Sequence, residues 1–253
     1  MHRRLFLAGS ALLLAAAERV PVAATPISRI DLPWWRQRHQ EKLAELRRGP
    51  VDLIWLGDSI TQDWELAGPE PWRDFAPIWQ RFYGDRHAIN LGFKGDTTAS
   101  LLWRMQNGEL DGIQPKAAVI LIGANNMGRV HWNDEQTVAG IAAVVDELRR
   151  RSPATRILLL AVLPSVRSRY VDRTTAAVNR ELAARYGGPG SPVTCMDLSS
   201  LFLRDGVVDR TQFLDDELRP PDPPLHPTAQ AQARIAEAIE PTLAAMLGDR
   251  VHN

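Results

Sequence analysis

The feature that most constrains the fold of this chain is a regular alternation of short apolar runs with longer helical patterns. The apolar runs are VDLIWLG, HAINLG, KAAVILIG, TRILLLAVL and PVTCMDL, at residues 51–57, 87–92, 116–123, 155–163 and 192–198. Short continuous runs of this kind are typical of parallel strands that are buried on both faces. The alternation therefore predicts an α/β fold, a three-layer α/β/α sandwich around a five-stranded parallel sheet.

Helical patterns fill the spaces before, between and after these runs. They cover residues 34–48, 72–81, 98–105, 135–151, 172–186 and 228–247. The chain shows no internal repeat, no low-complexity tract and no composition typical of an interdomain linker. We therefore predict that residues 25–253 form a single domain.

The first residues have the pattern of a targeting segment. Arg3 and Arg4 precede a mainly Ala and Leu stretch at residues 5–17, which is too short to span a bilayer as a mature helix. Paired arginines before Leu-Phe-Leu resemble a twin-arginine export signal, with an ordinary secretion signal or a membrane anchor as the alternatives. We predict that residues 1–24 are an export signal, cleaved after Ala17 or Ala24. The mature protein is then expected in the periplasm or outside the cell, without stable membrane insertion.

Charge and cysteine content exclude several classes of function. Thirty basic and thirty acidic residues give a net charge of zero, so no basic surplus attracts nucleic acid or an anionic membrane. The single cysteine, Cys195, excludes an intrachain disulfide and a cysteine-based zinc cluster. Its place in an apolar run favours an inert core thiol. No metal-ligand cluster is evident, and we expect neither a metal nor an organic cofactor.

Polar residues follow three of the predicted strands, where open α/β sheets place their sites. Ser59 follows the first strand within Gly57-Asp58-Ser59, and a serine at this turn can present its hydroxyl to a crevice. A capping serine or a phosphate-binding loop are the alternatives. Gly95 follows the second strand, where it could offer an unobstructed backbone N–H, and an ordinary turn glycine is the alternative. Asn125 follows the third, where its amide can donate to an oxyanion or serve only the turn.

A serine needs a base to become a good nucleophile, and one histidine is well placed for that role. His226 lies in the loop before the last helical pattern, with Thr228 as the expected helix cap. The other five are His2, His39, His87, His131 and His252, in the leader, a helix, a strand start, a loop and the tail.

Together these blocks resemble the SGNH hydrolase superfamily, also called GDSL esterases and lipases. Residues 102–110 and the pair Asn125-Asn126 resemble its platelet-activating-factor acetylhydrolase-like branch. The resemblance implies the flavodoxin-like SGNH fold, with Ser59 as nucleophile and His226 as base. It also implies an oxyanion hole formed by the backbone N–H groups of Ser59 and Gly95 and by the side chain of Asn125.

The chain departs from this family at the acid of the triad. The family has Asp three residues before the histidine, where this chain has Pro223, and Asp222 lies one residue earlier. We predict that Asp222 reaches the Nδ1–H of His226 through a bulged loop. A backbone carbonyl or a carboxylate from residues 215–217 are the alternatives.

The predicted function is hydrolysis of a carboxylic ester through an acyl-enzyme on Ser59. No long apolar insertion would serve as a lipase lid, which favours a short acyl group such as acetyl. The expected partner is a small-molecule or glycan ester. An acyltransferase on the same site and a non-catalytic carbohydrate-binding module are the alternatives.

Overall fold

The computed structural model describes residues 20–217 and 223–252, and its centre is a five-stranded sheet. The strands are β1 (Leu53–Gly57), β2 (Ala88–Gly92), β3 (Ala117–Leu121), β4 (Arg156–Leu160) and β5 (Val193–Met196). Their order across the sheet is β2-β1-β3-β4-β5, and every neighbouring pair is parallel. The predicted parallel sheet of five strands is confirmed.

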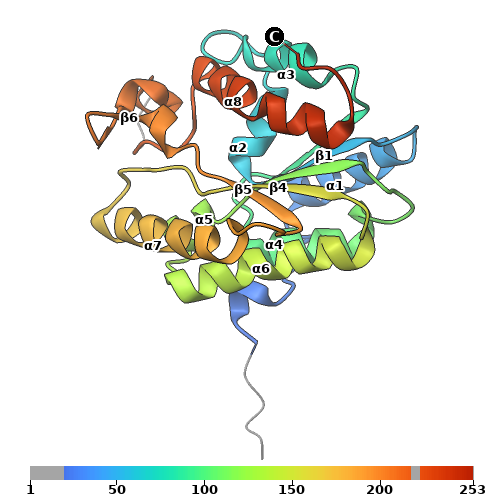
Figure 1. Ribbon diagram of the computed structural model, residues 1–253, viewed down its shortest axis with the longest axis horizontal. Coiled ribbons are helices and arrows are strands. Elements are labelled where there is room, and N and C mark those ends of the chain that lie inside the picture. Colours follow the sequence, from blue (N-terminus) through green and yellow to red (C-terminus); the bar gives the residue numbers. More distant parts are fainter. Residues whose placement is uncertain (1–19, 218–222, 253) are drawn as a thin grey trace, which may run out of the picture.

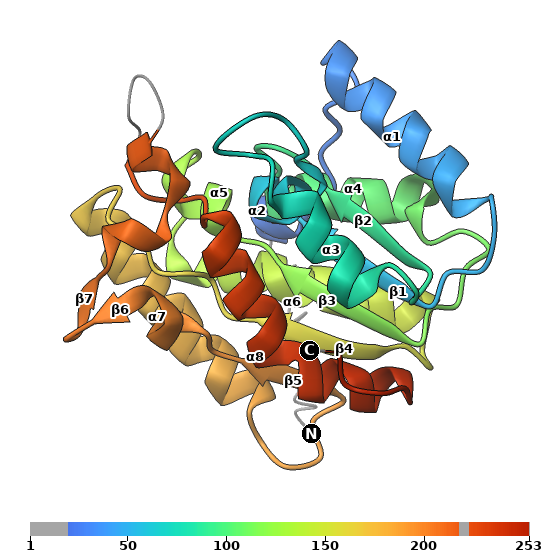
Figure 2. The same cartoon turned by 90° about the horizontal axis from the view of Figure 1, so that it is seen from above.

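Helices cover both faces of the sheet and complete three layers (Figure 1). One face packs against α4 (Thr98–Arg104), α6 (Asp134–Arg151) and α7 (Arg169–Tyr186), and the other against α3 (Phe75–Tyr83) and α8 (Ala229–Leu247). The remaining long helix, α1 (Pro33–Leu46), comes first in the chain and lies beside the β2 edge of the sheet (Figure 2).

The strand β1 shows how one apolar run serves two cores. Ile54 and Leu56 belong to the cluster beneath α4, α6 and α7, while Leu53 and Trp55 belong to the cluster beneath α3 and α8. All five residues of the strand are buried. Because successive side chains of a strand point to opposite faces, a strand between two helical layers must be apolar throughout.

Polar caps set where the long helices begin. Asn133 and Gln136 form a capping box at the start of α6. The side chains of Ser168 and Thr228 accept hydrogen bonds from backbone N–H groups in the first turns of α7 and α8. Such caps satisfy N–H groups that have no partner within the helix, so the chain direction is fixed where each loop ends.

Several short elements complete the fold, and the apolar periodicity does not predict them. They are the helices α2 (Ser59–Gln62) and α5 (Ala124–Gly128), and the antiparallel pair β6 (Leu203–Arg204) and β7 (Val207–Val208). The single-turn segments are η1 (Val22–Ala24), η2 (Asp63–Glu65), η3 (Met105–Glu109), η4 (Ser199–Phe202), η5 (Arg210–Gln212) and η6 (Leu214–Glu217). The helices α2 and α5 begin directly behind β1 and β3, so they direct the residues that follow these strands.

The segment η1 packs against the sandwich, although it falls within the predicted leader. Ala23 is fully buried, and its carbonyl oxygen accepts a hydrogen bond of 2.7 Å from the Thr98 hydroxyl. A Cβ atom on Gly140 of α6 would lie 2.7 Å from the same carbonyl oxygen. Residues 22–24 therefore contact both α4 and α6.

Candidate active site

The residues that follow β1, β2 and β3 meet at one edge of the sheet. The strand ends are in register, with Gly57 paired to Gly92 and to Leu121. The loops behind these ends border a cavity of about 410 Å³. The cavity is lined by Ser59, Asp63, Leu66, Trp72, Lys94, Gly95, Asn125, Arg129, Leu214, Leu225 and His226.

Ser59 lines this cavity, and the turn between β1 and α2 positions it there. It is the first residue of α2, and the Asp58 side chain before it accepts a hydrogen bond from the Ile60 N–H. A Cβ atom on Gly57 would lie 2.5 Å from the Leu121 carbonyl oxygen and even closer to Thr61. Only glycine fits there, which is why β1 can approach β3 closely and still turn sharply toward Ser59.

The hydroxyl of Ser59 meets the imidazole of His226. The distance between Ser59 Oγ and His226 Nε2 is 2.9 Å, across 167 residues of sequence. The loop that carries His226 is fixed by backbone contacts with the segment around η6, since the Leu214 N–H donates to the His226 carbonyl oxygen. An isolated bridge between Phe213 and Pro227 continues this pairing. The predicted nucleophile and base are therefore adjacent.

The partner of the second imidazole nitrogen is Asp215. Its Oδ1 lies 2.7 Å from His226 Nδ1, and its Oδ2 accepts hydrogen bonds from the Leu225 and His226 N–H groups. Since a carboxylate faces Nδ1, that nitrogen carries the proton and Nε2 accepts from Ser59. The sequence prediction gave this place to Asp222, which lies outside the described residues. We therefore replace Asp222 by Asp215 as the candidate acid.

The charges of this pair stabilise each other. Burial lowers the pKa of His226, but the hydrogen bond and the charge of Asp215 outweigh it, so the pKa is raised above its ordinary value. Burial raises the pKa of Asp215, but the bonds from His226 and Leu225 outweigh it, so that pKa is lowered. Asp215 therefore stays ionised while His226 titrates.

Three residues that line the cavity, Ser59, Gly95 and Asn125, carry candidate oxyanion donors. The side-chain amide of Asn125 points its Nδ2 between the Asp96 carbonyl oxygen, at 3.1 Å, and Asp58 Oδ2, at 3.3 Å. Gly95 has φ of 72°, a left-handed conformation that favours glycine. The N–H groups of Gly95 and Ser59 donate to no backbone carbonyl within the described residues. Such free donors beside a nucleophile can stabilise an oxyanion.

Asp58 links the nucleophile to this donor set. It is almost fully buried, and burial raises its pKa to about 7, against the effect of the hydrogen bond from the Ile60 N–H. Its two oxygens contact Ile60 and Asn125. The carboxyl of Asp58 thus fixes both the start of α2 and the Asn125 amide.

A buried ionic cluster lies behind the Gly95 loop. Asp96 accepts hydrogen bonds from Trp35, Arg29 and Arg104. Arg104 also binds Glu109 through two hydrogen bonds and donates to the Gly57 carbonyl oxygen at 3.3 Å. Both residues lie in the segment that resembles the acetylhydrolase-like branch, and no role was predicted for them. Their opposite charges, five positions apart and next to the apolar residues 101, 102 and 105, are the signal of an internal pair.

Two further histidines and the cysteine lie away from the cavity. His131 packs its ring against Tyr170, and His39 stacks on Trp35. Cys195 is half-buried in β5, and burial raises the pKa of its thiol. This environment agrees with the predicted inert thiol.

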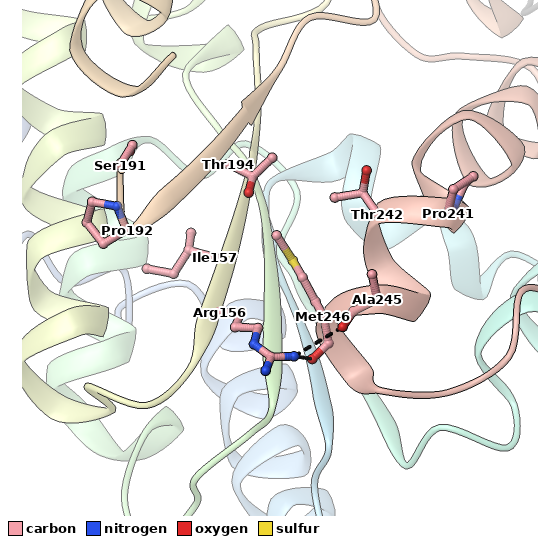
Figure 3. Close-up of a pocket in the computed structure, with 9 residues that line it drawn as sticks. All are labelled: Arg156, Ile157, Ser191, Pro192, Thr194, Pro241, Thr242, Ala245 and Met246. Atoms are coloured by element: carbon pink, nitrogen blue, oxygen red, sulfur yellow. Dashed lines mark hydrogen bonds between the residues drawn. The ribbon is translucent and has the colours of Figure 1, made fainter. Parts of the chain in front are cut away.

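A larger cavity, of about 640 Å³, lies at the opposite ends of the strands, beside α8 (Figure 3). It is lined by Arg156, Ile157, Ser191, Pro192, Thr194, Pro241, Thr242, Ala245 and Met246. The guanidinium of Arg156 donates to the carbonyl oxygens of Ala245 and Met246 and so binds the end of α8. The lining holds no carboxylate, histidine or cysteine, so it offers no base for nucleophilic catalysis.

The described residues contain neither a metal-ligand group nor a membrane-spanning helix. Among residues 20–217 and 223–252, no three His, Cys, Asp or Glu side chains are grouped to hold a metal ion. In the same part of the chain, no helix combines the length and apolar character needed to cross a membrane.

A serine hydroxyl beside an imidazole that is paired with a carboxylate, at the carboxyl edge of a parallel sheet, is the arrangement found in serine hydrolases. The model of the GDSL-like Lipase/Acylhydrolase family matches residues 55–234, which is more than half of the chain. The chain belongs to this family, and it is an ester hydrolase. The predicted superfamily is thereby confirmed.

Curated relatives lie in the branch that the sequence indicated. The chain is 30% identical over 232 residues to the platelet-activating factor acetylhydrolase IB subunit alpha2 of Gallus gallus, covering 90% of each chain. It is 29% identical over 231 residues to the corresponding subunit of Rattus norvegicus, also covering 90% of each chain.

Solved structures share the fold at lower identity. A putative acylhydrolase from Bacteroides fragilis has a TM-score of 0.64 and 18% identity, with 83% of this chain and 96% of that chain covered. A carbohydrate esterase family 3 protein from Talaromyces cellulolyticus has a TM-score of 0.58 and 17% identity, with 79% and 99% covered. These likenesses confirm the predicted fold class.

Proposed function

We propose that the protein hydrolyses esters of short acyl groups, such as acetate, through an acyl-enzyme on Ser59. The observation that carries the proposal is the chain of contacts from Ser59 Oγ to His226 Nε2, at 2.9 Å, and from His226 Nδ1 to Asp215, at 2.7 Å. Both distances are within the hydrogen-bond range needed for proton transfer.

The steps follow from this geometry. Ser59 Oγ attacks the ester carbonyl carbon while His226 Nε2 takes the hydroxyl proton. The N–H groups of Ser59 and Gly95 and the Asn125 amide then stabilise the negative oxygen of the tetrahedral intermediate. The carbon–oxygen bond to the alcohol breaks, and the alcohol leaves with the proton from His226. Water attacks the acyl-enzyme with His226 again as base, which releases the carboxylic acid and restores Ser59.

Two observations support a short acyl group. The cavity of about 410 Å³ is near the lower end of the usual range for small-molecule sites, which is roughly 300–1,000 Å³. The curated relatives are named acetylhydrolases, and one similar structure is a carbohydrate acetylesterase from Sinorhizobium meliloti. The proposed substrate is therefore a small-molecule or glycan ester. We also propose, from the paired arginines near the start of the sequence, that the protein acts in the periplasm or outside the cell.

The test is labelling with a fluorophosphonate, followed by a series of p-nitrophenyl esters from acetate to decanoate. We expect the label on Ser59 and the highest kcat/KM for the shortest esters. The variant Ser59→Ala should lose the label and several orders of magnitude in turnover while remaining folded. Labelling at another residue, or turnover close to that of the wild type in Ser59→Ala, would refute the assignment. A maximum at decanoate would refute only the short acyl group.

A further inference from the structure

One carboxylate in the active-site cavity has no role in the steps above. Asp63 lies four residues after Ser59, at the start of η2, so it is one helical turn beyond the nucleophile on the same face. Its side chain lines the cavity, and the residue is only 4% exposed. Its Oδ1 has no hydrogen-bond partner among the described residues.

A buried carboxylate oxygen without a hydrogen-bond partner beside an active-site cavity is unusual. Buried polar groups are almost always hydrogen-bonded, because burial without a partner costs free energy. Burial raises the pKa of Asp63, and the nearby positive charges of His226 and Lys94 oppose this only in part. The backbone around Asp63 offers no donor to its Oδ1. Because Asp63 also lines the cavity, a donor group carried by the substrate can reach this carboxylate from the cavity side.

The position of Asp63 relative to His226 indicates which part of the substrate it meets. Asp63 and His226 line the same cavity, and the charge of each acts on the pKa of the other. The leaving alcohol receives its proton from His226 Nε2. A carboxylate in the same cavity as this nitrogen is available to the alcohol part of the ester.

The rest of the cavity distinguishes between two kinds of donor. Lys94 and Arg129 line the same cavity beside Gly95, and both are exposed cations. A cationic alcohol such as an amino alcohol would be repelled by these two side chains. A neutral hydroxyl group is not repelled, and a second hydroxyl can accept hydrogen bonds from Lys94 or Arg129. Trp72 and Leu66 supply apolar surface for the carbon chain.

We propose that Asp63 determines specificity by accepting a hydrogen bond from a free hydroxyl group in the alcohol part of the ester. The preferred substrates are then partly acylated polyols or sugars rather than esters of simple alcohols. This inference rests on the proposed hydrolysis at Ser59.

The test compares two esters of the same size and shape. One is 1-O-acetylglycerol, and the other is 2-methylbutyl acetate, in which a methyl group replaces each hydroxyl. We measure the ratio of their kcat/KM values in the wild type and in Asp63→Leu. A hydrogen bond to a charged acceptor changes such a ratio by about tenfold to a hundredfold. We therefore expect the preference for acetylglycerol to fall at least about tenfold in Asp63→Leu.

Two more variants control the measurement. Asp63→Asn keeps the volume and one acceptor oxygen but removes the charge, so its ratio should lie between those of the wild type and Asp63→Leu. Glu65→Gln changes a carboxylate of the same η2 segment that binds Lys42 and does not line the cavity, so its ratio should equal that of the wild type. Fluorophosphonate labelling of each variant verifies an intact site.

The outcomes separate the two proposals. Equal loss on both esters in Asp63→Leu and Asp63→Asn would mean that Asp63 acts only on His226, and would overturn the specificity role. A wild type that hydrolyses both esters without preference would overturn it as well, while leaving the proposed hydrolase intact. A wild type that hydrolyses neither ester and takes no label would refute the proposed function, and the inference with it.

Discussion

At the scale of single residues, the carboxylate of Asp215 is oriented by three hydrogen bonds. Two backbone N–H groups, of Leu225 and His226, bind its Oδ2, while Oδ1 faces the imidazole. The backbone of the histidine loop therefore positions the acid that orients the histidine side chain. Such a carboxylate fixes the tautomer of the imidazole and stabilises the imidazolium that forms during the reaction.

We predict that Asp215→Asn lowers kcat by about four orders of magnitude, because an amide on Nδ1 favours the wrong tautomer. Steady-state hydrolysis of p-nitrophenyl acetate measures the loss. The matched variants Asp216→Asn and Asp222→Asn should keep most of the activity. A large loss in Asp222→Asn with little effect in Asp215→Asn would restore the sequence-based assignment.

The pKa of His226 predicts the pH dependence of the reaction. The imidazole must be neutral to accept the Ser59 proton, and its pKa is raised above the ordinary value by Asp215. Activity is therefore expected to rise with pH, through a pKa above the ordinary histidine value of about 6.5. The profile of kcat/KM against pH checks this. In Asp215→Asn, the carboxylate that raises the pKa of His226 is lost, while the burial that lowers this pKa remains. The imidazole pKa measured by NMR should therefore fall. An unchanged or higher value would contradict this account.

Among the proposed oxyanion donors, Asn125 is the one that a side-chain substitution can remove. We predict that Asn125→Ala lowers kcat by roughly a hundredfold to a thousandfold with little change in KM, because its hydrogen bond strengthens as charge develops. The neighbouring Asn126 provides a control, since its side chain makes two hydrogen bonds with Thr98. Asn126→Ala should lower stability rather than kcat. A rise in KM alone for Asn125→Ala would indicate a binding role instead.

The sequence predicted the positions of Ser59, Gly95 and Asn125 because each follows an apolar run by a few residues, whereas His226 was predicted from its loop before the last helical pattern. Parallel strands in register bring such positions together without further information. The acid could not be predicted in the same way. Asp215 precedes His226 by eleven residues in a loop without apolar periodicity, and backbone hydrogen bonds decide which carboxylate of that loop meets Nδ1.

At the scale of elements, the long helices and the strands were predicted to within a few residues. The predicted helix at residues 135–151 is α6, Asp134–Arg151, and the predicted run at residues 116–123 contains β3, Ala117–Leu121. The short helices α2 and α5 were not predicted, because a single turn shows no apolar period. They form because Asp58 caps the start of α2 and because residues of both short helices are buried, which is tertiary information.

The packing of η1 distinguishes between the two proposed cleavage sites. Cleavage after Ala24 would remove Ala23, which is fully buried and accepts a hydrogen bond from Thr98. Cleavage after Ala17 would keep this contact. We predict a mature protein that begins at Glu18, which N-terminal sequencing of the exported protein would show. Chains that begin at Glu18 should have a higher Tm than chains that begin at Thr25. A mature protein that begins at Thr25 or at Met1 would contradict the prediction.

At the scale of the whole molecule, one buried cation joins elements that are distant in the sequence. Arg104 of α4 binds Asp96 behind β2, Glu109 of η3 and the Gly57 carbonyl oxygen at the end of β1. Asp96 in turn accepts from Trp35 of α1, and its carbonyl oxygen accepts from Asn125. The Gly95 loop is therefore stabilised by a hydrogen-bond network that also connects α1 to the sheet.

This network predicts an unequal effect of removing similar ion pairs. Arg104 is fully buried, so Arg104→Met would leave Asp96 and Glu109 without their main partner, which typically costs about 3–5 kcal/mol. Arg150 of α6 also binds a glutamate, Glu147, but its side chain is 66% exposed. Arg150→Met should therefore have little effect on the free energy of unfolding.

Urea denaturation followed by tryptophan fluorescence measures both values. If Arg104→Met and Arg150→Met lose equal stability, the buried network does not hold the molecule together. At a temperature where Arg104→Met remains folded, its kcat should also fall, because Asp96 orients both the Gly95 loop and the Asn125 amide. A folded Arg104→Met protein with wild-type kcat would show that the Gly95 loop keeps its geometry without the network.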